Sequence, residues 1–308
     1  MPSRLAREEL RRASLGRPIA LALGKFDGVH RGHQALIRYL REQAAARGLA
    51  SGVVIFHPNP LTVLRPGTRA TYLTSLDERI ELLYGLALDM VAPVTFTSEL
   101  AQSSAEEFAR SLRDDVQMAL LVGGPDLALG RGREGTAERM REFGARFGYE
   151  LAIVPFESLD GGKVGSRAVR AALAQGDVGE AAKLLGRPFS LRGPVVRGAM
   201  RGRSLGFPTA NIALGADREL PALGVYATRA RVGEQSYDSV TNIGRRPTFD
   251  DGPPSVETFL LDFDADIYGY ELQIDLVLML RGETKFAGVE ELKAQIGHDV
   301  TAARAVLS

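Results

Sequence analysis

The sequence predicts an α/β plus β protein with two domains. Residues 1–185 form a doubly wound parallel sheet, and residues 186–308 form a small antiparallel β-barrel closed by a helix. Three observations predict this fold class. Strand and helix patterns alternate in the N-terminal half, short strands with turn residues fill the C-terminal half, and Gly186-Arg187-Pro188 separates the two patterns. A chain of 308 residues is also long for one hydrophobic core.

The N-terminal half alternates apolar runs with amphipathic stretches. Strands are predicted at 19–23, 51–56, 89–96, 118–122 and 149–156. Helices are predicted after residue 33 as far as Gly48 and at 76–86, 104–115, 136–147, 166–174 and 178–185, with a capping box from Ser104 to Glu107. This alternation indicates a parallel sheet with right-handed crossovers and a ligand crevice at the carboxyl ends of its strands.

The C-terminal half has a different pattern. Strands are predicted at 191–196, 224–232, 236–242, 256–263 and 271–280, and a final helix at 289–306. Short consecutive strands of this kind favour an antiparallel barrel with a C-terminal helix against it.

Composition excludes several classes of protein. The 38 basic and 38 acidic residues cancel, which leaves no electrostatic footprint for nucleic acid, and the absence of cysteine excludes a disulfide scaffold. Residues 1–18 do not resemble a signal peptide, and the longest apolar runs are too short to cross a membrane. We therefore expect a cytoplasmic protein without nucleic-acid or membrane partners; the sequence indicates no oligomeric state.

The most informative segment is 24–33, Gly-Lys-Phe-Asp-Gly-Val-His-Arg-Gly-His, between the first strand and its helix. A helix N-terminus offers unpaired N–H groups there, and glycine lets a polyphosphate approach the backbone. His30 and His33 can face one ligand and donate hydrogen bonds to phosphoryl oxygens during phosphoryl or nucleotidyl transfer. The alternatives are simple helix capping, or a zinc site, which would need a third ligand near this pair.

A second segment, 198–211, combines spaced glycines with arginines and a Thr/Asn pair. Glycines supply the turns of an anion-binding nest, and Thr209 and Asn211 offer the oxygen ligands that Mg²⁺ prefers. An ordinary glycine-rich hairpin is the alternative. Further on, Glu257 lies within an apolar strand, either facing solvent or facing a cleft, where it could take a proton from an attacking hydroxyl.

Both halves together resemble the prokaryotic bifunctional riboflavin kinase and FAD synthetase family. Residues 24–33 are similar to its adenylyltransferase signature, and residues 202–211, 241–249 and 256–263 are similar to three kinase motifs in the same order. The resemblance covers nearly the whole chain. It implies a Rossmann-like nucleotidyltransferase domain at 1–185 and a riboflavin kinase barrel at 186–308.

In the barrel, the resemblance implies that the terminal ribityl hydroxyl of riboflavin attacks the γ-phosphate of ATP and gives FMN. Glu257 would be the base, while Thr209 and Asn211 would help to hold Mg²⁺ and the phosphates. The residues that the resemblance places at substrate or nucleotide in this half are Gly198, Gly202, Gly206, Pro208, Thr209, Asn211, Asn242 and Arg246.

In the sheet domain, the resemblance implies that the phosphate of FMN attacks the α-phosphate of a second ATP and gives FAD and pyrophosphate. His30, His33 and Arg170 would be catalytic. The residues that the resemblance places at substrate or nucleotide here are Gly24, Phe26, Asp27, Gly28, Gly32, Asn59, Asp126, Ser166 and Arg167.

Three departures from the family pattern lie in the N-terminal domain. Gly165-Ser166-Arg167 stands where the family has Ser-Ser-Thr, Asn59 replaces a histidine, and Leu127 replaces an aromatic residue. Losing a hydrogen-bond donor to a charged group costs about 1.5–3 kcal/mol, although Arg167 can supply positive charge. Two alternatives stay open: a riboflavin kinase with impaired adenylyl transfer, and a flavin- or nucleotide-binding regulator without turnover.

Overall fold

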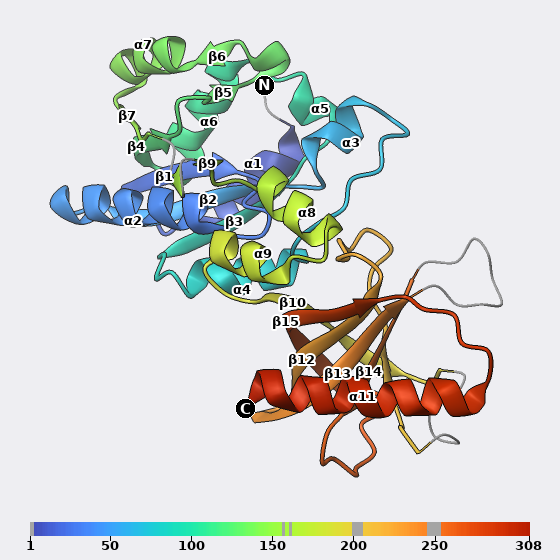
Figure 1. Ribbon diagram of the computed structural model, residues 1–308. Coiled ribbons are helices and arrows are strands. Elements are labelled where there is room, and N and C mark those ends of the chain that lie inside the picture. The colour runs from blue at the N-terminus through green and yellow to red at the C-terminus, as the bar shows by residue number, and fades with distance from the viewer. Residues whose placement is uncertain (1–2, 156–157, 160–161, 199–205, 245–253) are drawn as a thin grey trace. The chain divides into compact units, whose positions relative to one another are not determined.

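The computed structural model describes residues 3–155, 158–159, 162–198, 206–244 and 254–308 (Figure 1). The chain forms two compact units, Met1–Ser166 and Arg167–Ser308. The predicted domain boundary after residue 185 stays a prediction. The helices between positions 166 and 185 pack on the barrel: α9 contacts strands β10 and β15, and the Leu173 carbonyl accepts a hydrogen bond from the Ala222 N–H.

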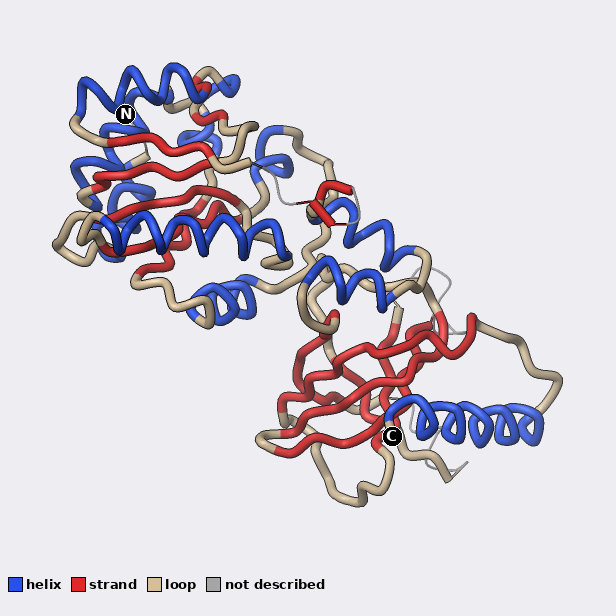
Figure 2. The backbone as a smooth tube through the Cα atoms, turned by 60° about the vertical axis from the view of Figure 1, so that its left-hand side comes forward, coloured by secondary structure: helices blue, strands red, loops and turns tan. Residues whose placement is uncertain are grey.

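The first unit contains a five-stranded sheet with helices on both faces (Figure 2). Its elements are α1 (Arg4–Ala13), β1 (Ile19–Gly24), α2 (Arg31–Ala46), β2 (Ala50–His57), α3 (Pro60–Leu64), α4 (Leu76–Tyr84), β3 (Met90–Thr95), α5 (Ser98–Ala101), α6 (Ala105–Val116), β4 (Met118–Gly123), β5 (Ala128–Leu129), a 3₁₀ turn (Arg131–Arg133), β6 (Gly135–Thr136), α7 (Ala137–Phe147), β7 (Glu150–Ile153), β8 (Ser158–Leu159), β9 (Gly162–Lys163) and the start of α8 (Ser166–Ala174).

The sheet order is β3-β2-β1-β4-β7, and all four strand pairs are parallel. The chain moves outward from β1 to β3 on one side and then returns to β4 on the other. The order therefore reverses between β1 and β4, and ligands bind at such a switch point in open α/β sheets.

Strand β1 is buried on both of its faces. Ile19 and Leu21 join one apolar cluster with α1, α6 and α7, whereas Ala20 and Ala22 join the other with α2 and α4. All four side chains are at most 1% exposed. The continuous apolar run in the sequence follows from this double burial, because alternate residues of a strand point to opposite faces.

Helix α1 is an element that the sequence analysis missed, because it assigned no structure to the charged N-terminal residues. Its arginines bind a distant partner: Arg7 Nε lies 2.7 Å from one carboxylate oxygen of Asp115, and Arg11 Nε lies 2.8 Å from the other. Burial raises the pKa of the Asp115 carboxyl, but the two guanidinium groups outweigh burial, so the pKa lies below its usual value.

The second unit is a closed antiparallel barrel of order β10-β11-β14-β13-β12-β15. Its elements are the remainder of α8, α9 (Val178–Leu185), β10 (Phe189–Val196), β11 (Ala210–Ile212), β12 (Gly224–Val232), β13 (Gln235–Gly244), β14 (Ser255–Leu260), β15 (Glu271–Gly282) and α11 (Val289–Leu307). Helix α11 packs Ala303 and Leu307 against Val225, Val240 and Leu261.

Hydroxyl groups bridge three barrel strands in the buried interior. Thr228 Oγ1 lies 2.7 Å from Ser239 Oγ and 2.8 Å from Thr241 Oγ1, which lies 3.0 Å from Thr258 Oγ1. None of these four residues is exposed to solvent. Each buried hydroxyl is satisfied by another, so the polar interior does not carry the cost of unpaired groups.

The predicted fold class agrees with the structure, and the differences are local. Strand β7 is shorter than predicted, and β14 ends at Leu260, before a turn in which Asp262 has a left-handed φ of 56°. The sequence analysis also missed β11, which overlaps the end of the glycine-rich segment, because three residues are too few to show a strand pattern.

We expect Asp115→Asn to lower the free energy of unfolding near neutral pH by about 1.5–3 kcal/mol, as for hydrogen bonds to charged groups. Since the folded-state pKa of Asp115 is lowered, its contribution is present above the unfolded-state pKa and is lost as the pH falls through the folded-state value. Urea denaturation from neutral to strongly acidic pH measures this difference. Glu8→Gln, at the exposed Arg4–Glu8 pair on α1, is the control and should leave the midpoint unchanged.

Candidate active sites

The segment 24–33 lies where the sequence predicts it, between β1 and α2 at the switch point of the sheet. Its backbone is unusual. Phe26 and Val29 have φ angles of 50° and 40°, and Gly28 has a φ of 79°. A left-handed φ is rare for a β-branched residue and costs about 1–3 kcal/mol. Such strain persists only where the surroundings hold it, and it is concentrated at functional sites.

The two histidines of this segment form a stacked pair. Their ring centroids lie 3.7 Å apart with an interplanar angle of 18°. His30 is the N-cap of α2, because its Nδ1 accepts a hydrogen bond from the His33 N–H at 3.3 Å. Gly32 allows this arrangement, since a Cβ at this position would lie 3.2 Å from His30 Nδ1 and from the Val164 carbonyl. Capping is therefore part of the role of His30.

His33 is partly exposed as a residue, whereas His30 is 6% exposed, but one nitrogen of the His33 ring is enclosed. Its Nδ1 is buried without a hydrogen-bond partner in the part of the chain that the structure describes. Burial lowers the pKa of His33 well below its ordinary value of 6.5, and the nearby His30, Arg79 and Lys25 lower it further. A neutral imidazole offers one donor and one acceptor, so His33 can exchange hydrogen bonds with a ligand without carrying a charge.

Several predicted residues of the sheet site bind other parts of the first unit. The Asp27 carboxylate accepts hydrogen bonds from the Leu73 and Thr74 N–H groups, and the Asp27 carbonyl accepts one from Ser166 Oγ. Asn59 caps α3 by accepting a hydrogen bond from the Leu61 N–H. These contacts give the predicted residues structural roles, and their predicted contacts with nucleotide stay predictions.

The remaining predicted residues of this half lie at different places. Asp126 is exposed, and the Leu127 side chain packs so close to Gly123 that a Cβ there would meet it at 3.0 Å. Arg167 is exposed in α8, and Arg170 Nε is bound to Glu219 Oε2 at 3.0 Å within the second unit. The predicted catalytic role of Arg170 therefore requires a guanidinium that already has a carboxylate partner.

In the barrel, strand register brings three predicted residues together. Asn211 on β11 pairs with Glu257 on β14, and Glu257 pairs with Asn242 on β13. Directly opposite residues of antiparallel strands present their side chains on the same face. Glu257 therefore stands between two amides on one face of the sheet, with its side chain half-buried and Asn242 exposed, and whether it faces a cleft stays a prediction.

Two hydroxyl groups contact the Glu257 carboxylate. Thr209 Oγ1 reaches Oε2 at 3.5 Å, and Ser255 Oγ reaches Oε1 at 3.4 Å, so each oxygen has one long hydrogen bond. The sequence analysis missed Ser255, although its i, i+2 spacing from Glu257 places both on one face of a strand. Gly198 lets the backbone pass close to the Asn211 side chain, because a Cβ at position 198 would lie 2.3 Å from Asn211 Nδ2.

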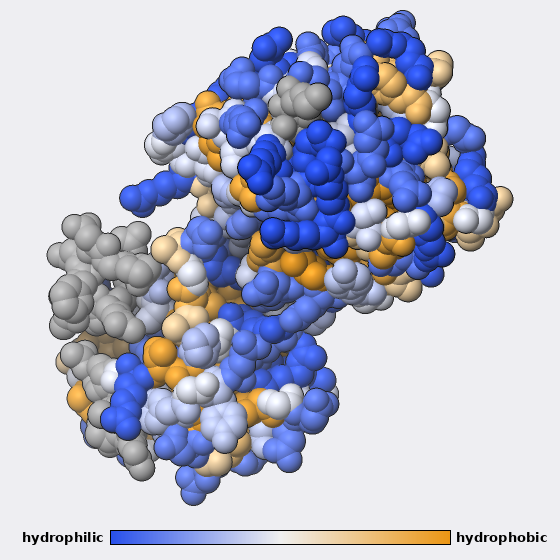
Figure 3. All heavy atoms as spheres, turned by 180° about the vertical axis from the view of Figure 1, so that it is seen from behind, coloured by the Kyte–Doolittle hydropathy of each residue, from blue (hydrophilic) through white to orange (hydrophobic). Residues whose placement is uncertain are grey.

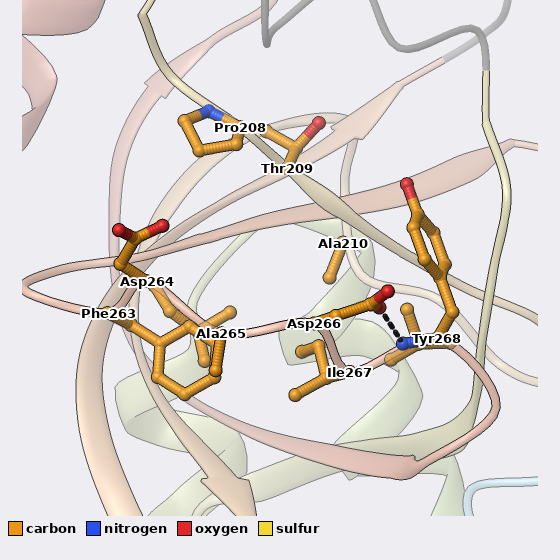
Figure 4. A pocket seen from close by; sticks show the side chains of 11 residues that line it. Pro208, Thr209, Ala210, Phe263, Asp264, Ala265, Asp266, Ile267 and Tyr268 are labelled. Atoms are coloured by element: carbon orange, nitrogen blue, oxygen red, sulfur yellow. Dashed lines mark hydrogen bonds between the residues drawn. The ribbon is translucent and has the colours of Figure 1, made fainter.

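A pocket of about 280 Å³ opens beside this cluster (Figure 4). Pro208 and Thr209 lie across it from the segment that runs from Phe263 to Tyr268, in which Asp266 Oδ1 accepts a hydrogen bond from the Tyr268 N–H at 2.9 Å. The sequence analysis did not place these later residues at a site. Thr209 connects the two features, because it lines the pocket and also contacts Glu257. Gly206, with a φ of 86°, precedes this stretch, whereas Gly202 and Arg246 lie outside the described residues.

None of the helices in the described ranges is long and apolar enough to cross a bilayer. The face of the molecule drawn in Figure 3 is mainly hydrophilic, with hydrophobic residues in small groups.

A histidine pair at the switch point of a parallel sheet, in one chain with a closed six-stranded barrel, defines a class of protein that joins a nucleotidyltransferase-like domain to a kinase-like barrel. Two known protein families match the two domains, in this order along the chain. A family model for FAD synthetase matches residues 13–168, and one for riboflavin kinase matches residues 185–307.

Named relatives match most of the chain. The bifunctional riboflavin kinase/FMN adenylyltransferase of Pseudomonas fluorescens is 40% identical over 286 residues, which cover 92% of this chain and 91% of the relative. The protein of the same name from Escherichia coli strain K12 is 38% identical over 287 residues, with the same coverage. The chain therefore belongs to the family of bifunctional riboflavin kinases/FMN adenylyltransferases.

One solved structure has a similar fold over nearly its whole length. It comes from Streptococcus pneumoniae and is described as a macrolide-efflux protein. It is 31% identical, has a TM-score of 0.89, and covers 99% of this chain and 98% of its own. This likeness supports the two-domain architecture.

We expect the His33 ring to stay neutral through the pH range in which an ordinary histidine gains a proton. Because its folded-state pKa is lowered, only the unfolded state takes up the proton just below pH 6.5, so stability falls as the pH falls through that range. ¹⁵N spectra of the imidazole report the charge directly, and urea denaturation of His33→Phe should show a smaller loss of stability with acid than the wild type. A His33 ring that titrates near 6.5 would contradict this reading.

Proposed function

We propose that the barrel of this chain phosphorylates riboflavin to FMN and that the sheet domain adenylylates FMN to FAD. The order of the two family matches supports both steps. The observation that carries the kinase step is the placement of Glu257 between Asn211 and Asn242, next to a pocket that shares Thr209 with it.

In the kinase step, Glu257 is the general base. Its carboxylate takes the proton of the terminal ribityl hydroxyl as that oxygen attacks the γ-phosphorus of ATP, and ADP leaves with the electrons of the broken P–O bond. The hydroxyl groups of Thr209 and Ser255 each donate a hydrogen bond to one oxygen of the Glu257 carboxylate, and together they orient it before the substrate arrives.

The pocket is the proposed nucleotide site. Val195, Leu260 and Ile267 supply apolar walls for a base, and Asp264 and Asp266 place two carboxylates along one side. Those charges repel a polyphosphate, so the phosphates are expected to point toward Thr209, where the reacting hydroxyl and Glu257 meet.

The residues around Glu257 also fit Mg²⁺. The described residues hold no cluster of three histidine, acidic or cysteine side chains, so a divalent ion would depend on hydroxyl, amide and phosphate oxygens. Thr209 and Asn211 offer such oxygens, and Asn211 is 7% exposed. When bound, Mg²⁺ neutralises charge on the β- and γ-phosphates.

In the adenylyl step, a phosphate oxygen of FMN attacks the α-phosphorus of ATP and pyrophosphate leaves. The N-terminus of α2 supplies N–H donors and a positive dipole end at the switch point. His30 and His33 stabilise the charge that builds on the α-phosphate by donating hydrogen bonds to it.

A riboflavin kinase with weak adenylyl transfer is the second candidate. It is favoured by the departures at 165–167 and by Asn59, whose side chain caps a helix. The purified chain supplied with riboflavin, ATP and Mg²⁺ decides between the two by chromatography of the flavins. FAD as the main product supports two efficient activities, FMN that accumulates without FAD supports the second candidate, and the absence of both FMN and FAD would refute both.

We expect Glu257→Gln to lower FMN formation by about 10²–10⁴-fold, the usual contribution of a positioned general base. Conversion of supplied FMN to FAD should stay within about twofold of the wild type, because Glu257 belongs to the barrel. Initial rates of each half-reaction measure the two effects. Glu234→Gln, in the turn between β12 and β13, is the matched control and should leave both rates unchanged.

We expect His30→Ala to have the opposite profile, with FAD formation from FMN lowered by about 10²–10³-fold, as for the loss of a hydrogen bond to a developing charge. Riboflavin phosphorylation should persist. Because His30 also caps α2, His30→Asn keeps an N-cap acceptor and separates the two roles. Undiminished FAD formation in His30→Ala would disprove the role of His30 in the transfer.

A further inference from the structure

Arg79 on α4 is the largest fully buried side chain of the described residues, with 0% exposure. Its guanidinium binds the loop before the histidines. Nη1 donates to the Lys25 carbonyl at 3.0 Å, and Nη2 donates to the Thr74 carbonyl at 3.0 Å and to Asp27 Oδ1 at 3.4 Å. A charge in the interior is costly unless it is paired and hydrogen-bonded, and here the guanidinium binds the loop and the segment beside it.

These contacts surround the strained part of the backbone. Lys25 and Asp27 flank Phe26, whose φ is 50°. Thr74, which binds Arg79, also accepts a hydrogen bond on Oγ1 from the Gly28 N–H at 3.1 Å. Arg79 and Thr74 together therefore fix residues 25–28 from outside the segment, which supplies the restraint that a left-handed backbone at Phe26 needs.

The held loop leads directly to the histidine pair. The Phe26 ring lies 5.1 Å from the His33 ring, and the His33 ring stacks on His30 at 3.7 Å. Phe26 is 1% exposed, so its ring has little room to shift. A change in the backbone at 25–28 would therefore move the rings that face the reacting phosphate.

Arg79 also reaches the end of the neighbouring strand. Its guanidinium carbon lies 5.4 Å from the centre of the Tyr72 ring, and the Tyr72 hydroxyl accepts a hydrogen bond from the Asn59 N–H at 2.7 Å. The His57 ring at the end of β2 lies 5.4 Å from the same Tyr72 ring. One buried cation thus connects the carboxyl ends of two adjacent parallel strands, where the ligand crevice of the sheet lies.

We propose that Arg79 is a positioning residue for adenylyl transfer. It holds residues 25–28 in the strained conformation that sets His30 and His33 at the start of α2. The inference rests on the proposed adenylyl-transfer function of this site. Because Arg79 is fully buried, its loss is expected to change the rate of the chemical step more than the affinity for ATP or FMN.

The test compares Arg79→Met, Arg79→Lys and the wild type as full-length chains. We expect Arg79→Met to lower kcat for FAD formation from FMN by about 10²-fold while KM stays within about threefold, the effect of a small misplacement of catalytic groups. Arg79→Lys should recover kcat to within about tenfold of the wild type, because an ammonium can still bind the two carbonyls. A KM that rises while kcat is unchanged would overturn the proposal.

Two controls separate positioning from folding. Riboflavin phosphorylation by the same preparations reports the amount of intact chain and should stay within about twofold. Arg7→Met removes another arginine with a buried carboxylate partner in the first unit, and it should lower stability without lowering kcat for FAD formation. An equal loss of kcat in Arg7→Met would show that any destabilised sheet domain loses activity, which would also overturn the proposal.

A double mutant gives the sharpest outcome. If Arg79 acts through the histidines, Arg79→Met in a His30→Ala background should cost no more than about threefold further, whereas independent effects would multiply. Should Arg79→Met fail to fold, Arg79→Lys and Thr74→Val carry the test, because Thr74→Val removes the acceptor for the Gly28 N–H. A wild type that forms no FAD refutes the proposed function itself, while FAD formation at wild-type kcat in Arg79→Met refutes only this inference.

Discussion

The burial of β1 on both faces is the constraint on which the sheet domain depends. Ile19 and Leu21 anchor one helical layer, and Ala20 and Ala22 accept the other. A strand with two covered faces cannot slide by one residue without exchanging its large and small side chains between the layers. The point at which the chain leaves the strand is thereby determined, and the following loop emerges at the switch point of the sheet.

The two sites are built by different physical means. At the sheet, the backbone at Phe26 and Val29 is strained, and a buried guanidinium with its partners restrains the neighbouring residues. In the barrel, the ladder of hydrogen bonds aligns Asn211, Glu257 and Asn242 in a row that spans three strands. At a phosphate site the backbone must come close to the ligand, and a strained loop conformation can bring it there. A general base needs only a side chain with a fixed direction, and the pairing of neighbouring strands is enough to fix it.

This difference explains how well each site could be predicted. The strand and helix pattern around residues 24–33 is local, and so the position of His30 and His33 could be predicted from periodicity and glycine chemistry alone. The sequence left two interpretations of Glu257 open, because a carboxylate in an apolar strand can face either solvent or a cleft. Its neighbours across the strands, Asn211 and Asn242, lie 46 and 15 positions before it in sequence, and no periodicity within one strand indicates them.

The sequence by itself determined the fold class, most elements and the histidine pair, since these follow from the spacing of apolar residues and from turn chemistry. The tertiary structure alone decided that Asp115 holds the N-terminal helix, that Arg79 is buried against the signature loop, and that Thr209 belongs to both a pocket and the Glu257 cluster. In each case the partners are far apart along the chain. Which distant polar groups meet depends on how the layers pack, and a pattern within one segment holds no information about that.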